Sequence, residues 1–234
     1  MARDASTDLE TLSRLLAPRG KDVVDIGCGG GALVRELAAL GARPTGVEIS
    51  LHQLAPALAA DPDGAAGGRY LVGRAEQLPL ADGAVDAAVF MRSLHHVPTE
   101  HLTEALREAR RVVRPGGIVY VVEPLTEGDY FALTTLVEDE LEVRRAAQRA
   151  LDGAGQAGLE RETTAEYDVT VRLAGPEAYR RRTVSVDPER AAVFDARRDE
   201  IAAAFARLGA PGDQPGERVF IQPMRADVLR ARSA

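Results

Sequence analysis

The chain has 234 residues, 45% of them hydrophobic, which is enough for one full α/β core. Its 29 basic and 36 acidic residues give a net charge of −7, which argues against nucleic acid as a partner because a polyanion would meet overall repulsion. The single cysteine excludes an intramolecular disulfide, and the polar start and lack of a long apolar run predict a soluble cytoplasmic protein without a membrane partner.

In chain order, an N-terminal helical pattern comes first, and short apolar runs then alternate with helical patterns from residue 20 to about residue 124. Helices are expected at Asp8–Leu16, Ala32–Leu40, Leu51–Ala60 and Thr99–Val113. Strands are expected at Asp22–Ile26, Pro44–Ile49, Tyr70–Val72, Val85–Met91 and Ile118–Glu123. The strands are almost continuously apolar, which indicates a parallel sheet buried on both faces, with the helices as crossover connections. The pattern is that of a doubly wound βαβ chain.

Capping residues and a stop motif mark the ends of the expected helices. Ser50 is expected to cap the second helix of the alternating part and Thr99 the third, while Arg114-Pro115-Gly116-Gly117 stops the chain before the fifth strand.

The C-terminal part departs from simple alternation. A helix is expected at Tyr130–Leu151, a strand at Tyr167–Leu173, helices at Pro176–Arg182 and Pro188–Leu208, a Pro/Gly loop at Gly209–Gly216 and a last strand at Arg218–Met224. We predict one domain over residues 1–234, with an N-terminal helix in 1–20, a cofactor-binding core in 21–124 and an acceptor-side or lid region in 125–234.

A glycine-rich loop follows the first core strand. The run Gly27-Cys28-Gly29-Gly30-Gly31 leads into a helix, so backbone N–H groups and a helix N-terminus can approach a ligand directly. Glu48 ends the next strand about 20 residues later, which suits a carboxylate that accepts hydrogen bonds from ribose hydroxyls. Because Gly27-x-Gly29-x-x-Ala32 nearly satisfies the dinucleotide fingerprint, NAD and S-adenosylmethionine (SAM) both remain open at this point.

Asp25 separates these two cofactors. A carboxylate two residues before Gly27 would repel the pyrophosphate of NAD in a partly dry site. SAM has no phosphate, and its sulfonium and α-ammonium groups are both attracted to a carboxylate. Asp25 could instead hold loop N–H groups, a role that is compatible with SAM. The residues therefore favour SAM.

Several motifs, taken in order, resemble a known family. These are Val24–Gly31, Gly46–Ser50, Gly73–Leu80 followed by Val85–Val89, Ser93–Val97 and Arg114–Gly117. Together, over about residues 20–124, they resemble class I SAM-dependent methyltransferases, in the pattern of the small-molecule enzymes of ubiquinone and menaquinone biosynthesis. Residues 125–234 match no substrate class.

The resemblance implies a Rossmann-like α/β fold with a doubly wound, seven-stranded, mostly parallel sheet and an antiparallel C-terminal strand. It also implies methyl transfer to oxygen, nitrogen, carbon or sulfur of a small molecule, with S-adenosylhomocysteine as product. The residues assigned to the cofactor are Asp25, Gly27, Cys28, Gly29, Glu48, Ile49, Ala75, Glu76 and Met91.

One position departs from the family. Arg74 stands where an aspartate often accepts from the adenine amino group, and an arginine cannot accept a hydrogen bond. Either adenine is read by backbone groups around Ala75 and by Glu76, or Arg74 turns outward.

Methyl transfer from a sulfonium is an in-line substitution that needs few catalytic groups. His95 and His96 follow the fourth strand at the carboxyl edge and are candidates for a base or an acceptor contact. Weaker substrate candidates are Arg92, Glu123, Tyr130 and Tyr179. No metal is expected, because no third ligand at metal spacing accompanies the histidines. The alternatives are an NAD-dependent oxidoreductase and a SAM-binding protein without methyl transfer; the acceptor and the oligomeric state stay open.

Overall fold

The computed structural model describes residues 3–60 and 67–232. The chain forms two compact units. The first consists of Met1–Thr7, Pro124–Arg144 and Glu166–Met224, and the second of Asp8–Glu123, Arg145–Ala165 and Arg225–Ala234. The single domain over residues 1–234 and its three parts stay a prediction.

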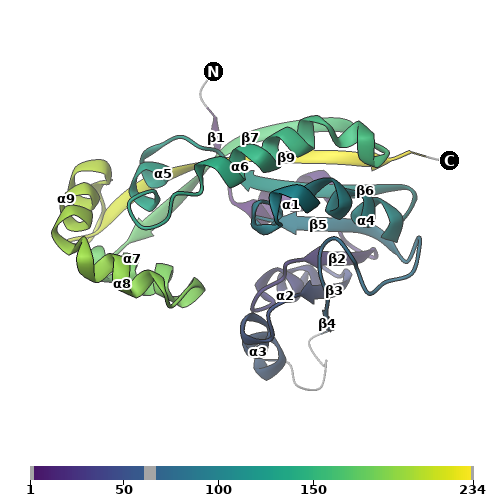
Figure 1. The fold of residues 1–234 in the computed structure, drawn as a ribbon, viewed down its shortest axis with the longest axis horizontal. Helices are drawn as coiled ribbons and strands as arrows, with labels where there is room; N and C mark the ends of the chain where they lie inside the picture. The colour runs from purple at the N-terminus through teal and green to yellow at the C-terminus, as the bar shows by residue number, and fades with distance from the viewer. Residues whose placement is uncertain (1–2, 61–66, 233–234) are drawn as a thin grey trace. The chain divides into compact units, whose positions relative to one another are not determined.

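Five parallel strands form most of the sheet in the second unit (Figure 1). The central strand β2 (Asp22–Ile26) lies between β3 (Arg43–Glu48) and β5 (Val85–Met91). Outside these, β4 (Arg69–Val72) pairs with β3, and β6 (Val113–Pro124) pairs with β5. The five strands follow the order expected of a doubly wound sheet, with β2 at the point where the order reverses.

Two long C-terminal strands complete this sheet. β9 (Arg218–Ala231) lies between β6 and β7 (Leu159–Leu173), which gives the order β7-β9-β6-β5-β2-β3-β4. Near its end, β9 contacts the start of both neighbours: Arg230 Nη1 donates to the Gly116 carbonyl at 2.7 Å, and the Arg232 N–H donates to the Gly158 carbonyl at 3.2 Å. β9 therefore runs antiparallel to both, and the predicted fold class is confirmed.

Helices of the second unit pack on these strands as their apolar stripes require. α1 (Asp8–Leu16) and α3 (Leu51–Ala60) have the predicted bounds, and α2 (Ala32–Ala39) ends one residue early. α2 packs against β3, α3 against β3 and β4, and α4 (Leu102–Val112) against β5. The strands and α4 bury one apolar cluster that includes Val24, Phe90, Leu106, Val112 and Val121.

Of the two predicted helix caps, Ser50 is confirmed and Thr99 is wrong. Ser50 Oγ accepts the Gln53 N–H at 3.3 Å, so the cap at the start of α3 is confirmed. Thr99 does not cap α4, because two short 3₁₀ turns, η1 (Leu94–His96) and η2 (Thr99–His101), come first and the Thr99 hydroxyl donates to its neighbour's side chain. Residue 101 takes the N-cap position of α4 without a side-chain hydrogen bond.

The stop before the fifth strand is a bulge inside β6. Pairing with β5 passes from Val113 opposite Val85 directly to Ile118 opposite Ala87. The residues of Arg114-Pro115-Gly116-Gly117 bulge out between these two pairs, and Gly116 has φ +75°. The helix ends before this motif, at Val112, one residue before the predicted end.

Two predicted C-terminal helices are each broken in two. Tyr130–Leu151 is α5 (Asp129–Thr134) and α6 (Leu141–Asp152). Both threonine hydroxyls at the end of α5 donate to the Phe131 carbonyl, which competes with continued helix, and Asp139 Oδ1 accepts the N–H of the first residue of α6 at 3.0 Å. Pro188–Leu208 is α8 (Arg190–Ala196) and α9 (Arg198–Leu208), separated by one residue at φ −118°.

The remaining elements are α7 (Pro176–Val186), η3 (Ala154–Ala157), β1 (Asp4–Ala5) and β8 (Ala210–Pro211). In the first unit, β1 pairs in parallel with β7 and β8 pairs antiparallel with β9. Its core is aromatic, with Tyr179, Phe194, Phe205 and Phe220 buried together. Of the helices in the described ranges, none combines the length and the apolar character needed to cross a bilayer.

Candidate functional site

The candidate site lies at the carboxyl end of β2, where the strand order reverses. The chain leaves β2 toward α2, while it leaves the neighbouring strand β5 toward η1. Open α/β sheets bind ligands in the crevice formed at such a point. The glycine loop after β2 and the two histidines after β5 therefore belong to one edge of one sheet.

Two glycines in the loop have different surroundings. A Cβ on Gly27 (φ +77°) would lie 2.7 Å from Ser93 Cβ, so only glycine fits where the loop passes the end of β5. A Cβ on Gly29 (φ +49°) would have no atom within 4 Å. The loop is therefore closed on the Ser93 side and open at Gly29, where a ligand can approach the backbone.

The amides of the loop are already used within the chain. The N–H groups of Gly27 and Cys28 both donate to the Val47 carbonyl, at 2.8 and 3.1 Å. The Gly29 N–H donates to Glu48 Oε2 at 3.0 Å, and the Gly31 N–H donates to the Cys28 carbonyl at 2.9 Å. A phosphate cradle needs such donors directed at the ligand. Four N–H groups of this loop donate to acceptors within the chain, which disfavours binding of a pyrophosphate.

Asp25 is buried beside this loop with an unused acceptor. Its side chain is 2% exposed, and Oδ1 has no hydrogen-bond partner among the described residues. Burial, together with the charges of Glu48 and Glu36, raises the pKa of Asp25 to about 7. An acid in this state gains most from a cation placed next to it, because the cation restores the charged form.

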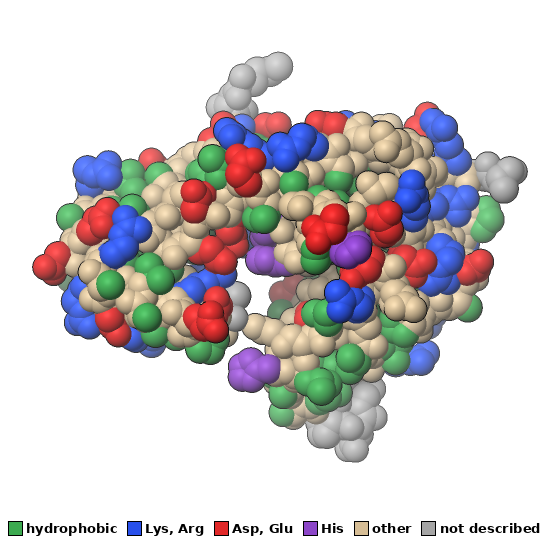
Figure 2. Space-filling model, viewed as in Figure 1, with side chains coloured by type: hydrophobic (Ala, Val, Ile, Leu, Met, Phe, Trp, Pro, Cys, Tyr) green, Lys and Arg blue, Asp and Glu red, His purple; other side chains and the backbone are tan. Residues whose placement is uncertain are grey.

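Glu48 ties the loop to the next strand. Its Oε2 accepts the Gly29 N–H at 3.0 Å, and its Oε1 accepts the Ser50 N–H at 2.9 Å. These contacts fix both carboxylate oxygens at the end of β3, where each keeps a further lone pair. The neighbouring apolar side chains are exposed: Ile49 55%, Leu51 67%, Leu58 46% and Val72 54%. Figure 2 shows apolar side chains gathered over this α3 and β4 region.

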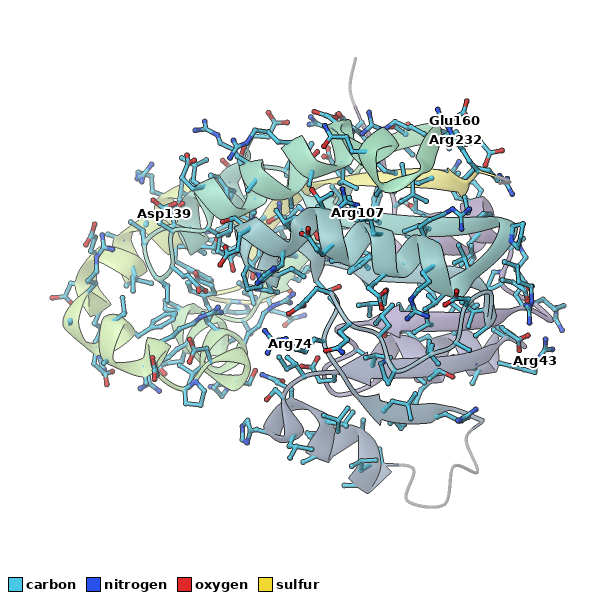
Figure 3. The ribbon with its side chains drawn as sticks, turned by 45° about the vertical axis from the view of Figure 1, so that its right-hand side comes forward. Arg43, Arg74, Arg107, Asp139, Glu160 and Arg232 are labelled. Atoms are coloured by element: carbon cyan, nitrogen blue, oxygen red, sulfur yellow. The ribbon has the colours of Figure 1, made fainter. Side chains whose placement is uncertain are left out.

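The turn after β4 lies next to Glu48. The Gly73 N–H donates to the Glu48 carbonyl at 3.1 Å, and the Gln77 N–H closes the turn by donating to the Arg74 carbonyl at 3.2 Å. Arg74 is 53% exposed (Figure 3), and its Nε lies 2.5 Å from Glu76 Oε1. Arg74 thus turns to the surface and pairs with Glu76, and Ala75 lies between them in the turn.

The Arg74 pairing decides the charge of Glu76. Burial alone would raise the pKa of this carboxyl, but the hydrogen bond from Arg74 and a backbone N–H outweigh burial and lower it. Glu76 therefore stays ionised at neutral pH.

His95 is held by Glu123 from the next strand. His95 and Glu123 are 4% and 1% exposed, and His95 Nδ1 is hydrogen-bonded to Glu123 Oε2. Glu123 Oε1 accepts the N–H of Leu94 at 2.9 Å and of His95 at 3.4 Å. The carboxylate therefore fixes both the ring and the backbone of η1. His96 is exposed, with its ring centroid 4.0 Å from that of His95.

A strained residue turns the chain from β5 into η1. Arg92 follows Met91 with φ +56°, a conformation that costs about 1–3 kcal/mol in a residue with a side chain. Its N–H donates to the Val122 carbonyl at 2.9 Å, and its guanidinium pairs with Asp8 at the start of α1. The kink places Ser93 against Gly27, where Ser93 Oγ donates to the Ile26 carbonyl at 2.5 Å. Sequence reasoning assigned no role to Asp8 or Ser93, since neither contact is local.

Three remaining candidates, Cys28, Tyr179 and Tyr130, pack against other residues of the chain. Burial raises the pKa of the Cys28 thiol to about 12, and Cys28 packs beside Gly46, whose Cβ would lie 2.6 Å from Sγ. Tyr179 belongs to the first unit, is fully buried and donates its hydroxyl to the Leu133 carbonyl at 3.3 Å. Tyr130 contacts the Tyr179 ring edge-on at 6.4 Å and also lies under the Arg182 guanidinium.

The fold is Rossmann-like, and its glycine loop lies beside a buried carboxylate at the sheet edge where the strand order reverses. The comparisons with known proteins agree: residues 24–121 match the family model described as a methyltransferase domain. This confirms the resemblance to methyltransferases that the motifs predicted.

Individual relatives are similar over part of the chain. The ubiquinone biosynthesis O-methyltransferase of Xanthomonas axonopodis pv. citri is 33% identical over 122 residues, which cover 48% of this chain and 47% of that protein. The malonyl-acyl-carrier protein O-methyltransferase of Pectobacterium atrosepticum is 33% identical over 142 residues, which cover 61% and 49%. The chain spans about half the length of the curated relatives it matches.

Solved structures extend the likeness of the fold to most of the chain. The crystal structure of BH2331 from Bacillus halodurans C-125 has a TM-score of 0.68 at 21% identity and covers 97% of this chain and 100% of that one. At this identity the match shows the fold alone.

Proposed function

We propose that the chain is a SAM-dependent methyltransferase that transfers a methyl group to a small-molecule acceptor. The matched residues 24–121 and the methyltransferase names of the relatives support the reaction class. The observation that carries the choice of cofactor is the buried Asp25 with its unpartnered Oδ1, next to a loop whose amides are engaged elsewhere. A sulfonium ligand supplies the missing positive charge, whereas a pyrophosphate adds negative charge.

The residues present fit SAM in three places. Glu48 is positioned to accept from ribose hydroxyls, Asp25 attracts the cationic end, and the open backbone at Gly29 admits the ligand. The exposed Ile49 and the turn carrying Ala75 and Glu76 border the same edge and offer contacts to adenine. Cys28 and Met91 take part through backbone position. SAM supplies an activated methyl group, and the chain's task is to place an acceptor in line with it and to exclude water.

His95 is the proposed base for an acceptor that starts protonated. The His95 imidazole takes the acceptor proton, and the Glu123 carboxylate at Nδ1 stabilises the imidazolium that results. Glu123 is thus a positioning residue in this proposal. His96, Arg92, Tyr130 and Tyr179 remain candidate acceptor contacts.

The test is acceptor-dependent formation of S-adenosylhomocysteine from SAM, measured by mass spectrometry with a panel of phenols, amines and thiols. We expect product with at least one class, and a loss of about 10²- to 10⁴-fold in His95→Gln at unchanged SAM affinity. Glu123→Gln should lower turnover and shift its pH profile. If the protein binds SAM but yields no product with any acceptor, the alternative of a binding protein without methyl transfer replaces this proposal.

The absence of a metal cofactor, a cytoplasmic location and the lack of a nucleic-acid partner stay predictions from the sequence. The relatives named above are O-methyltransferases that act on different acceptors. An oxygen acceptor is therefore the first class to try.

A further inference from the structure

Residues of α4 hold the segment that follows the Arg74–Gln77 turn. The backbone N–H of Leu78, directly after the turn, donates to Glu108 Oε2 at 2.8 Å, and its carbonyl accepts from Arg111 Nη2 at 3.2 Å. Leu78 is only 4% exposed and belongs to the main core cluster. The turn therefore ends on a residue that is fixed both by packing and by two polar contacts.

Arg111 extends this hold over the rest of the segment. Its Nη1 donates to the Leu80 carbonyl at 2.8 Å and to Asp82 Oδ1 at 2.7 Å, while its own carbonyl accepts the Gly83 N–H at 2.9 Å. Its Nε and Nη2 donate to the two carboxylate oxygens of Glu108 at 2.7 and 2.8 Å. The hydrogen bond from Arg111 is the main cause that lowers the pKa of Glu108, so the pair is charged. Two residues one helical turn apart thus order residues 78–83.

We propose that Glu108 and Arg111 are positioning residues for cofactor binding. They touch no part of the proposed SAM site themselves. They hold the far end of the turn Arg74–Gln77, whose near end is joined to Glu48 by the Gly73 N–H. The inference rests on the proposed function, because it assigns the turn to the adenosine half of SAM.

The expected size of the effect follows from conformational populations. Without the Arg111 guanidinium, residues 78–83 lose its contacts to the Leu78 and Leu80 carbonyls and to Asp82, and the turn before them samples other conformations. If it is competent about a tenth of the time, the apparent affinity for an adenosine ligand falls about tenfold.

Two arginines close to Arg111 in the sequence, Arg107 and Arg114, serve as matched controls. Arg114 makes a comparable network with Asp86, with Asp22 Oδ2 at 3.1 Å and with the Ala84 carbonyl at 3.1 Å, at the opposite edge of the sheet from the site. Arg107, labelled in Figure 3, lies on α4 itself, is 55% exposed and pairs with Glu104. Substitution of Arg114 should lower stability without disturbing the turn. Substitution of Arg107 removes a positive charge from α4, the helix that also carries Arg111.

The experiment is calorimetric titration of the full chain with S-adenosylhomocysteine and with 5′-methylthioadenosine. Arg111→Gln should weaken both ligands by the same factor of about ten, since both contain the adenosine half. Glu108→Gln keeps an acceptor for the Leu78 N–H and should lose less. Arg114→Gln should lower the melting temperature with unchanged affinity, and Arg107→Gln should change neither.

Amide hydrogen exchange separates this inference from the proposed function, because it needs no cofactor. In Arg111→Gln, the amides of Gln77, Leu78 and Gly83 should exchange faster, while those of Arg107→Gln match the wild type. Faster exchange with unchanged affinity for both ligands, or no faster exchange, overturns the positioning role. A wild-type chain that binds neither ligand overturns the proposed function, and the inference falls with it.

Discussion

Replacing Asp25 by asparagine removes a charge that SAM binding is expected to use. In the wild type, burial and the neighbouring acids raise the pKa of Asp25 to about 7. About a tenth of the molecules are then ionised at about pH 6 and about nine-tenths at about pH 8. If the ionised form is the one that binds the permanent cation of SAM, affinity should rise about tenfold over this range.

Asp25→Asn should bind SAM with no such rise, and at about pH 8 it should bind about tenfold or more weakly than the wild type. A cation about 5 Å away at an effective dielectric constant of about 20 is worth about 3 kcal/mol, so the loss is easily measured. Isothermal titration at a series of pH values gives both quantities. A control, Glu36→Gln on the exposed side of α2, should keep the rise but shift its midpoint to lower pH.

Asp25→Asn should also change the pH dependence of folding stability, which in the wild type runs opposite to that of SAM affinity. The free folded protein keeps the Asp25 proton up to about pH 7, whereas the unfolded chain loses it near its ordinary value of 3.8. The folded state therefore binds more protons between these values, and its stability falls as pH rises through this window, by up to roughly 4 kcal/mol. Asp25→Asn should lose this slope. An unchanged slope together with an unchanged pH dependence of SAM binding would refute the reasoning.

Three further substitutions or treatments test other parts of the site. Glu48→Ala should weaken SAM binding by roughly 1–3 kcal/mol in titration, and an unchanged affinity would remove the ribose contact. Cys28, 8% exposed with its pKa raised to about 12, should resist iodoacetamide in the folded protein and react only after unfolding, as followed by mass. Gly31→Ala places a Cβ 2.5 Å from Tyr70 Oη at φ +71° and should cost roughly 2–3 kcal/mol in thermal denaturation; a normal melting temperature would contradict the geometry.

Regular patterns in the sequence predicted the alternating half of the chain well. The bounds of α1, β2, α3 and β5 coincide with the predicted ones, because each is a short amphipathic or apolar run. The helix expected at Tyr130–Leu151 failed for a local reason. Its periodicity continues through the break, but threonine hydroxyls and an aspartate compete for the backbone there.

Contacts between distant residues in the site could not be read from the sequence. Asp25 and Glu48 were placed by motif spacing, but the unpartnered oxygen of Asp25 is visible only in three dimensions. Glu123 was a weak substrate candidate, and the structure shows it bonded to His95 across 28 residues. The contacts of Arg111 to the Leu78 and Leu80 carbonyls likewise join residues more than 30 positions apart. Sequence patterns report which face is buried, whereas polar pairing depends on register between elements.

The most direct test of the account is titration of one preparation with SAM, S-adenosylhomocysteine and NADH. We expect one SAM bound per chain, S-adenosylhomocysteine bound at the same site, and no binding of NADH, because the loop amides are engaged and Asp25 repels a pyrophosphate. Stoichiometric binding of NADH without binding of SAM would contradict the account.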